Sequence, residues 1–216
     1  MIIPNKHGEK LVGLLHEAKS KEIVVLCHGF RSRKDYNTMA NLAAALEKEG
    51  ISVFRFDFAG NGESEGGNVV LLYASKYQDS RTVINVSGRY DLKRGIAERL
   101  GEDFMEIIKE EYIDVKNDTG GVEYRVTEET LMDRLETDTR EACLEIDKLC
   151  RVLTVHGSAD EIIPLEHALE FAKIIPNHQH LRLSAVAGTP CSDKVEQLLK
   201  WSIWNRLVIV IVVTVV

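Results

Sequence analysis

The sequence predicts an α/β fold: a mostly parallel β-sheet flanked by helices. Two observations predict it. Short runs of apolar, β-branched residues recur along the chain, as at Ile23–Cys27 and Thr82–Ser87, and such runs are typical of strands that are buried on both faces of a sheet. Amphipathic helical segments separate these runs. Strands that alternate with helices are joined by right-handed crossovers, which place neighbouring strands parallel to one another.

The N-terminal part alternates strands and helices in a regular order. Strands are predicted at Lys10–Glu17, Ile23–Cys27 and Ile51–Phe58. A helix near Thr38–Glu49 presents one apolar face, formed by Met39, Leu42, Ala43 and Leu46. A glycine-rich turn that contains Ser64 follows the third strand and leads into a helix near Asn68–Tyr77. The strand Thr82–Ser87 comes next.

The segment from about 89 to 148 interrupts this alternation. It is rich in charge, has helical periodicity and a Gly120-Gly121 pair that we interpret as a hinge, and contains no convincing buried strand. We therefore expect a helical lid insertion over the strand ends. Asp138, with Glu141 three residues later, predicts the start of a helix over 138–149 that returns the chain to the sheet.

The C-terminal part begins with a strand at Arg151–His156. A helix is predicted at 165–175, with an apolar face made of Leu165, Ala168, Leu169, Ala172 and Ile175. A last strand at 181–186 is followed by a divergent region from about 188 to 216 with a weak helix around Lys194–Trp204. The tail at 207–216 is β-branched throughout and much shorter than the roughly 20 residues of a membrane span. We expect it to form a strand, which would promote aggregation if unpaired.

Composition limits the classes of function. A length of 216 residues with 44% hydrophobic content indicates one domain over 1–216. The net charge of −7, without a basic cluster, argues against a nucleic-acid partner. The four cysteines include no C-x-x-C pair, and no secretory signal is present, so we expect reduced thiols in a cytoplasmic protein; Cys143 and Cys150 are expected on one helix face. The histidines lack metal-ligand spacing, so neither a metal nor a cofactor is predicted.

Four segments together resemble a known family. They are L-C-H-G-F at 26–30, D-F-A-G-N-G-E-S at 57–64, G-G-N-V-V-L-L-Y-A at 66–74 and V-H-G-S-A-D-E-I-I-P at 155–164. Over about 23–175 the chain resembles the α/β-hydrolases, near their serine-aminopeptidase, monoglyceride-lipase and esterase-like members. The resemblance implies acyl transfer on a small ester or amide, with a serine nucleophile, an oxyanion hole, and an acid that orients a histidine.

Two site residues follow from this resemblance. The backbone N–H of Phe30 is placed to stabilise an oxyanion, and Asp160 is placed as the acid of the triad. The residues alone leave other roles open, because Phe30 could lie in an ordinary strand-ending turn and Asp160 could cap the helix that begins near Pro164. Asp57 starts the D-x-x-G-x-G-x-S loop, for which we expect a packing role and no catalytic one.

Ser64 is the candidate nucleophile, because 62–66 fits the pattern G-x-S-x-G. In the family, however, a helix and a buried strand separate the D-x-x-G-x-G-x-S loop from the nucleophile turn, and both are missing between 64 and 66. We therefore predict a sheet without one central strand, as a truncated isoform would have. Ala59–Glu63 separate Ser64 from its strand, and Glu65 would repel an oxyanion, so the alternative is a loop serine.

The catalytic histidine is also missing. The family places it after the last strand, where this chain reads A-G-T-P-C-S-D. His167, His178 and His180 do not match that place, and we expect them at the surface. The sequence thus indicates a relative of serine ester or amide hydrolases (esterase, lipase or aminopeptidase type) with impaired catalysis, so whether it acts as an enzyme stays open. The alternatives are a non-catalytic binding or interaction protein on a hydrolase scaffold, and a chain that barely folds without its central strand.

Overall fold

The computed structural model describes residues 1–5, 8–20, 23–29, 32–58, 66–110, 112–117, 119–158, 160, 163–183 and 209–213. Ser64, Phe30, Cys191 and the helix expected around 194–204 lie outside these residues.

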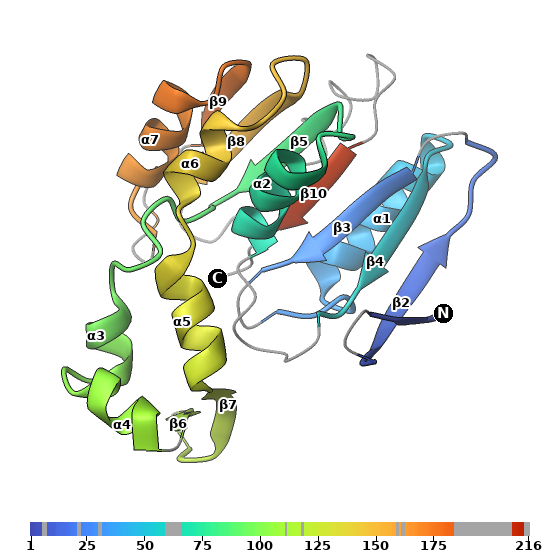
Figure 1. The fold of residues 1–216 in the computed structure, drawn as a ribbon. Helices are drawn as coiled ribbons and strands as arrows, with labels where there is room; N and C mark the ends of the chain where they lie inside the picture. Colours follow the sequence, from blue (N-terminus) through green and yellow to red (C-terminus); the bar gives the residue numbers. More distant parts are fainter. Residues whose placement is uncertain are drawn as a thin grey trace.

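A mostly parallel β-sheet forms the centre of the molecule (Figure 1). Within the described ranges it has eight strands, in the order β1-β2-β4-β3-β10-β5-β8-β9. Their bounds are β1 Ile2–Pro4, β2 Lys10–His16, β3 Ile23–His28, β4 Ser52–Phe56, β5 Thr82–Val86, β8 Arg151–Gly157, β9 His178–Leu183 and β10 Ile209–Val213. Only the β1–β2 and β2–β4 pairs of this sheet are antiparallel. The predicted mostly parallel sheet is confirmed.

The centre of the sheet differs from the prediction. We expected a gap where the family has a central strand, but in the described sheet β10 lies there, parallel to both β3 and β5. Figure 1 shows it in red between the blue and green strands. The prediction was wrong because it considered only the shortened segment around 64–66. The β-branched tail, which we expected to be a strand, pairs along both of its edges.

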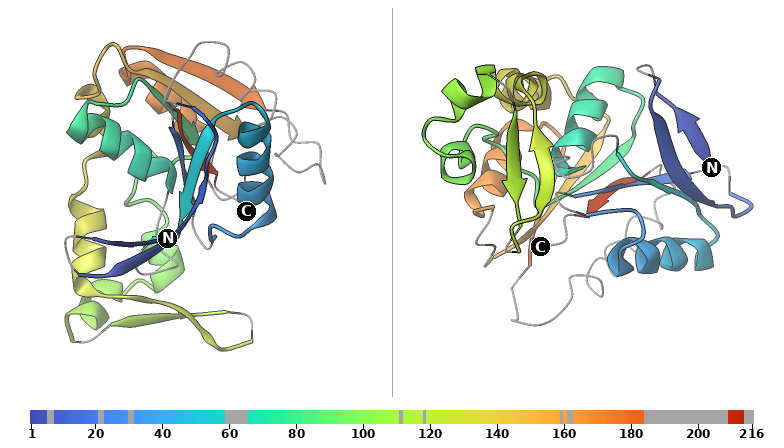
Figure 2. Two further views of the ribbon diagram at one scale, coloured as in Figure 1. Left: turned by 90° about the vertical axis from the view of Figure 1, so that its right-hand side faces the viewer. Right: turned by 90° about the horizontal axis from the view of Figure 1, so that it is seen from below.

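Helices cover the sheet on both faces, as Figure 2 shows for α1 and α2. Helix α1 (Asn37–Lys48) lies on one face, and its predicted apolar residues pack with Leu26, Ile84 and Val155. The helices α2 (Gly66–Tyr77), α6 (Thr139–Leu144) and α7 (Glu166–Ile174) share a second core cluster with Cys27, Val83 and Val152. The sheet therefore separates two apolar layers.

The buried face of α7 differs from the predicted one. Leu169 is exposed, whereas His167 and Phe171 are buried. The Phe171 ring meets the ring of Tyr90 edge to face, with centroids 5.4 Å apart. This aromatic contact places Phe171, and not Leu169, on the buried face of α7.

The segment between β5 and β8 has its own small core. It contains α3 (Ile96–Leu100), α4 (Phe104–Glu110), β6 (Ile113–Lys116), β7 (Val122–Val126) and α5 (Glu128–Glu136). We predicted helices alone, but β6 and β7 form an antiparallel hairpin, and the predicted hinge is its turn, with Gly120 at φ +80°. These elements lie beyond the edge toward which β3 and β10 point (Figure 1).

Helix α6 begins as predicted, because the Asp138 side chain accepts a hydrogen bond from the Glu141 N–H. The helix ends at Leu144, before the predicted limit. Cys143 and Cys150 are both buried in one cluster, but Cys150 follows the helix rather than sharing its face.

Candidate active site at the carboxyl edge of the sheet

The carboxyl ends of the parallel strands bring four loops to one edge of the sheet. His28 is the last residue of β3, Asp57 and Phe58 follow β4, Ser87 follows β5, and Asp160 lies three residues beyond β8. Parallel sheets bind their ligands at this edge. Of the predicted site residues, Asp160 is present at this edge in the described chain; Ser64 and Phe30 lie outside the described residues.

His28 fixes the ends of β3 and β4 to one another. Its buried ring donates from Nδ1 to the Gly29 carbonyl over 3.0 Å and accepts at Nε2 from the Phe58 N–H over 3.4 Å. The Phe58 ring contacts the imidazole edge to face, with centroids 5.0 Å apart. Both ring nitrogens are engaged, so His28 connects Gly29, at the end of β3, to Phe58, beyond β4.

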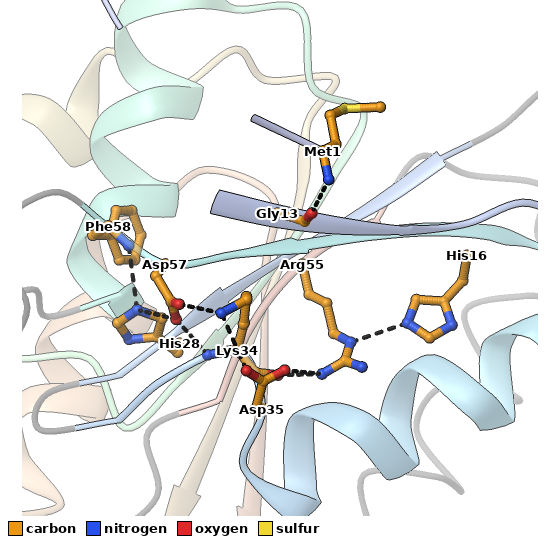
Figure 3. Close-up of polar contacts among 9 residues, drawn as sticks. All are labelled: Met1, Gly13, His16, His28, Lys34, Asp35, Arg55, Asp57 and Phe58. Carbon is orange, nitrogen blue, oxygen red and sulfur yellow. Dashed lines mark hydrogen bonds and ion pairs between the residues drawn. The ribbon is translucent and has the colours of Figure 1, made fainter. Parts of the chain in front are cut away.

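Asp57 and Lys34 join the two loops that leave β3 and β4 (Figure 3). Lys34 donates to the Asp57 carboxylate from its backbone N–H over 2.7 Å and from Nζ over 2.5 Å. Burial alone would raise the pKa of Asp57, but the hydrogen bonds and charge of Lys34 outweigh it and leave that pKa below its ordinary value. The hydrogen bond to Asp57 in turn raises the pKa of Lys34. This pair confirms a packing and turn role for Asp57.

The same polar network continues to the other edge of the sheet (Figure 3). Arg55 on β4 donates to the Lys34 carbonyl and, from Nε, to His16 Nε2 over 3.0 Å. His16 Nδ1 then faces a carboxylate oxygen of Glu47 at 3.3 Å. Arg55 thereby contacts loop 32–36 directly, and His16 on β2 contacts Arg55 in turn.

The first turn of α2 is locked against the end of β5. The Asn68 side-chain amide pairs with the backbone of Arg89, donating over 2.5 Å and accepting over 3.0 Å. A Cβ on Gly67 would lie 2.7 Å from the Gly88 Cα, so this approach needs a glycine. Ser87 takes the left-handed region at φ +48°, which lets the chain turn beneath the helix.

Asp160 organises its own loop after β8. Its Oδ1 accepts a hydrogen bond from the Ile163 N–H over 2.9 Å, within the loop. Helix α7 begins at Glu166, and its N-cap Leu165 has no side-chain capping bond, so Asp160 does not cap this helix. Its Oδ2 lies 3.9 Å from Nε2 of His156, and that nitrogen donates to the Ile163 carbonyl over 2.7 Å. The loop thus presents a carboxylate at the edge of the sheet and fixes its direction. Sequence reasoning assigned no role to the fully buried His156, although a histidine within an apolar strand was a signal of one.

The comparisons with known proteins agree with this architecture. Residues 18–100 match the family described as serine aminopeptidase, S33. The fold is similar to Est1E from Butyrivibrio proteoclasticus with ferulic acid bound, with a TM-score of 0.75 and 18% identity over 95% of this chain and 98% of that one. The chain has the α/β-hydrolase fold.

Two further solved structures extend the likeness. The fold is similar to the esterase domain of a Rhodothermus marinus protein, with a TM-score of 0.68 and 16% identity over 94% of this chain and 96% of that chain. It is also similar to mouse alpha/beta hydrolase domain-containing protein 10, with a TM-score of 0.64 and 16% identity over 95% and 96% of the two chains. None of the curated proteins matches it.

A cavity of about 520 Å³ lies beside the loop after β5. The loop after β5, the α5–α6 junction and α7 line it, through Tyr90–Arg94, Leu135–Arg140, Glu166, His167 and Glu170. Its volume lies within the roughly 300–1,000 Å³ of small-molecule sites. Its lining includes the loop that leaves the carboxyl end of β5, but His28, Asp57 and Asp160 do not line it.

Of the three histidines predicted at the surface, the structure contradicts the prediction for His167. His167 is buried, and its Nδ1 accepts from the backbone N–H groups of Tyr90 and Asp91 over 2.8 and 3.2 Å. Burial, aided by nearby arginines, lowers the pKa of His167, so the ring is neutral at pH 7. His178 is half-buried and shares a hydrogen bond with the Thr154 hydroxyl over 2.7 Å. The side chain of His180 lies outside the described residues.

Other chemistries find little support in the part of the chain that is described. Burial raises the pKa of the Cys27 thiol to about 12 and that of Cys143 to about 12, so neither is a thiolate nucleophile at neutral pH. No group of three or more described His, Cys, Asp or Glu side chains could hold a metal ion. Within the same residues, the helices are too short or too polar to cross a membrane.

Proposed function

We propose that this α/β-hydrolase is of the serine ester or amide hydrolase type (esterase, lipase or aminopeptidase) and that its catalytic centre is impaired. One observation carries the proposal: the path of the chain around α2. Helix α2 follows β4 in the chain but packs on β5, β10 and β3, and β10 comes from the C-terminal tail. A nucleophile elbow holds its serine directly between one strand and the helix that packs on that strand.

The mechanism implied by the family is acyl transfer on a small ester or amide. In this proposal the N–H of Phe30 serves the oxyanion and Asp160 is the acid, while Ser64 is a loop serine without a histidine to activate it. The contact from Ile163 to Asp160 supports a loop-fixing role for this carboxylate. Loss of the base in a serine triad lowers the rate by roughly 10⁴-fold or more.

The same proposal covers organisation and location. We take residues 1–216 as one domain with the lid at about 89–148, and the shortened 64–66 junction as that of a truncated isoform. Cys27, Cys143 and Cys150 are free and buried, as suits a protein of the reducing cytoplasm. A small molecule is the expected partner, and nucleic acid is not.

Labelling with a fluorophosphonate probe tests the proposal. We expect labelling that does not depend on Ser64: the wild type and Ser64→Ala should give the same weak background, as should the control Ser75→Ala, a serine within α2. An active serine esterase treated in parallel verifies the probe. Strong labelling of the wild type and of Ser75→Ala that disappears in Ser64→Ala would show that Ser64 is a working nucleophile. It would overturn the proposal that the catalytic centre is impaired.

The second candidate is a non-catalytic binding protein, and the cavity beside Tyr90 favours it. Ferulic acid, an aromatic carboxylic acid that one similar structure contains, is a suitable ligand for a binding measurement on the same variants. Saturable binding of ferulic acid by both the wild type and Ser64→Ala, without Ser64-dependent labelling, would favour binding over catalysis.

A further inference from the structure

The central position of the sheet is filled from the far end of the chain. The backbone register places Val210–Val213 opposite Val25–His28 of β3, and Ile209–Ile211 opposite Thr82–Ile84 of β5. The strand before it, β9, ends at the sheet edge, with β8 and β5 between β9 and β10. The last described strand in the sequence therefore lies among the early ones (Figure 1).

This position joins two halves of the sheet. The other neighbour of β3 is β4, and the other neighbour of β5 is β8. In the described sheet β3 and β5 are thus connected only through β10. Without it, each would expose a row of unpaired N–H and C=O groups in the middle of the core, where such groups must be paired.

The residues on either side of the central strand position are apolar, which favours an apolar strand there. Leu26 on β3 and Ile84 on β5, both buried, lie opposite position 211 and belong to the core layer under α1. Cys27 lies opposite position 212 and belongs to the layer under α2, which packs against β10. The sequence I-V-I-V-V has the β-branched composition of a strand that is covered on both faces, and it lacks proline.

We propose that Ile209–Val213 is a replacement strand, donated by the chain to its own sheet, and that the groove between β3 and β5 is a strand-acceptor site for a parallel, β-branched segment. This inference does not depend on the proposed function. It concerns how the scaffold is completed, whether or not the scaffold is catalytic.

The register gives a direct test with a native cysteine. Val212→Cys would place a thiol opposite Cys27, and neighbouring strands lie about 4.8 Å apart, within the roughly 4.4–6.8 Å between Cα atoms that a disulfide spans. Ile211→Cys is the matched control, because position 211 pairs with Leu26 and successive strand positions lie on opposite faces of the sheet. Each full-length variant is refolded in a glutathione redox buffer, so that access to the core does not limit oxidation, and its disulfides are mapped by mass spectrometry.

We expect monomers of Val212→Cys to form a disulfide between Cys27 and the thiol introduced at position 212, and Ile211→Cys to form almost none between positions 27 and 211. The linked Val212→Cys protein should also unfold at a higher temperature than its reduced form. Equal linkage in both variants, or no linkage in either, would overturn the register and with it the proposal. Disulfide-linked dimers would show that a second copy donates the strand, which contradicts donation within the chain.

Discussion

Lys34 and Asp57 form an ion pair between the loops that follow β3 and β4. Their side chains are 13% and 19% exposed, so the pair is largely shielded from water but not fully buried. Two hydrogen bonds reach the carboxylate, one from the Lys34 backbone and one from its Nζ. A pair in this setting lies between exposed pairs, which contribute about 0–1 kcal/mol, and buried ones, whose disruption costs about 3–5 kcal/mol.

Lys34→Met should therefore destabilise the protein by about 2 kcal/mol at pH 7, because it leaves the Asp57 carboxylate without its cation. Urea unfolding of both proteins measures the difference. Since the pKa of Asp57 is lowered by folding, the stabilisation is complete above the ordinary value of 3.8 and is lost as the pH falls through the lower pKa of the folded state. The difference between wild type and variant should shrink over that acidic range.

At alkaline pH the contribution of Lys34 to stability depends on pH in the opposite direction. Folding raises the pKa of Lys34 above 10.5, so its contribution is complete below that value and is lost as the pH rises through the folded-state pKa. Lys10→Met, at an exposed position of β2, is the matched control and should cost less than about 0.5 kcal/mol. Equal losses in the two variants, or a Lys34→Met difference that persists in acid, would contradict this account.

At the scale of elements, the start of α2 is fixed by close contact rather than by helix propensity. Alanine is favoured over glycine by about 1 kcal/mol inside a helix, so propensity alone would make Gly67→Ala stabilising. The added methyl would however lie 2.7 Å from the Gly88 backbone and 2.8 Å from Asn85 Oδ1. Overpacking of this kind typically costs about 1–3 kcal/mol.

Gly67→Ala should thus lower the free energy of unfolding by about 2 kcal/mol, as measured by urea denaturation. Gly121→Ala, in the hairpin turn, is the matched control: its Cβ would meet nothing closer than 3.5 Å, and we expect a change within about 0.5 kcal/mol. A stabilised Gly67→Ala variant would mean that the helix start does not press against β5.

The elements show what the sequence can predict. The strands of the parallel sheet and the helices α1, α2 and α7 were found within a few residues, because buried strands and amphipathic helices carry strong periodic signals. The hairpin β6–β7 was missed because I-D-V-K and V-E-Y-R-V alternate apolar and charged residues within a segment interpreted as helical. The position of β10 in the sheet could not be predicted from the local sequence. A pattern that predicts a strand does not identify the strands with which it pairs.

The candidate site was predictable in part. The motif around Asp160 predicts a carboxylate at a strand end, which the structure contains, and roles for Ser64 and Phe30 stay predictions. The contacts of His156 and His167 were not predictable, because both histidines are bound by backbone groups brought together only by the fold. Histidine is only intermediate in how often it is buried, and here tertiary hydrogen bonds to the backbone accompany the burial of both side chains.

At the scale of the whole molecule, cooperativity depends on the central strand. Position 211 lies between Leu26 and Ile84, which are 0% and 3% exposed, so a charge placed there would enter the core layer that both halves of the sheet share. An unpaired buried charge costs several kcal/mol, against a total stability of about 5–15 kcal/mol for a domain. We expect Ile211→Lys to abolish the cooperative thermal transition or to lower its midpoint by more than about 10 °C.

Ile2→Lys is the matched control, because it makes the same isoleucine-to-lysine substitution on a strand that does not connect the two halves of the sheet. Ile2 on β1 is 64% exposed and lies at the edge of the sheet. This variant should keep a midpoint within about 2 °C of the wild type, because its charge stays in water. Circular dichroism during heating gives both midpoints, and hydrogen exchange locates the loss, which should include the amides of β3 and β5. If Ile211→Lys unfolds like Ile2→Lys, then β3 and β5 hold together without the tail, and the strand between them does not sustain the fold.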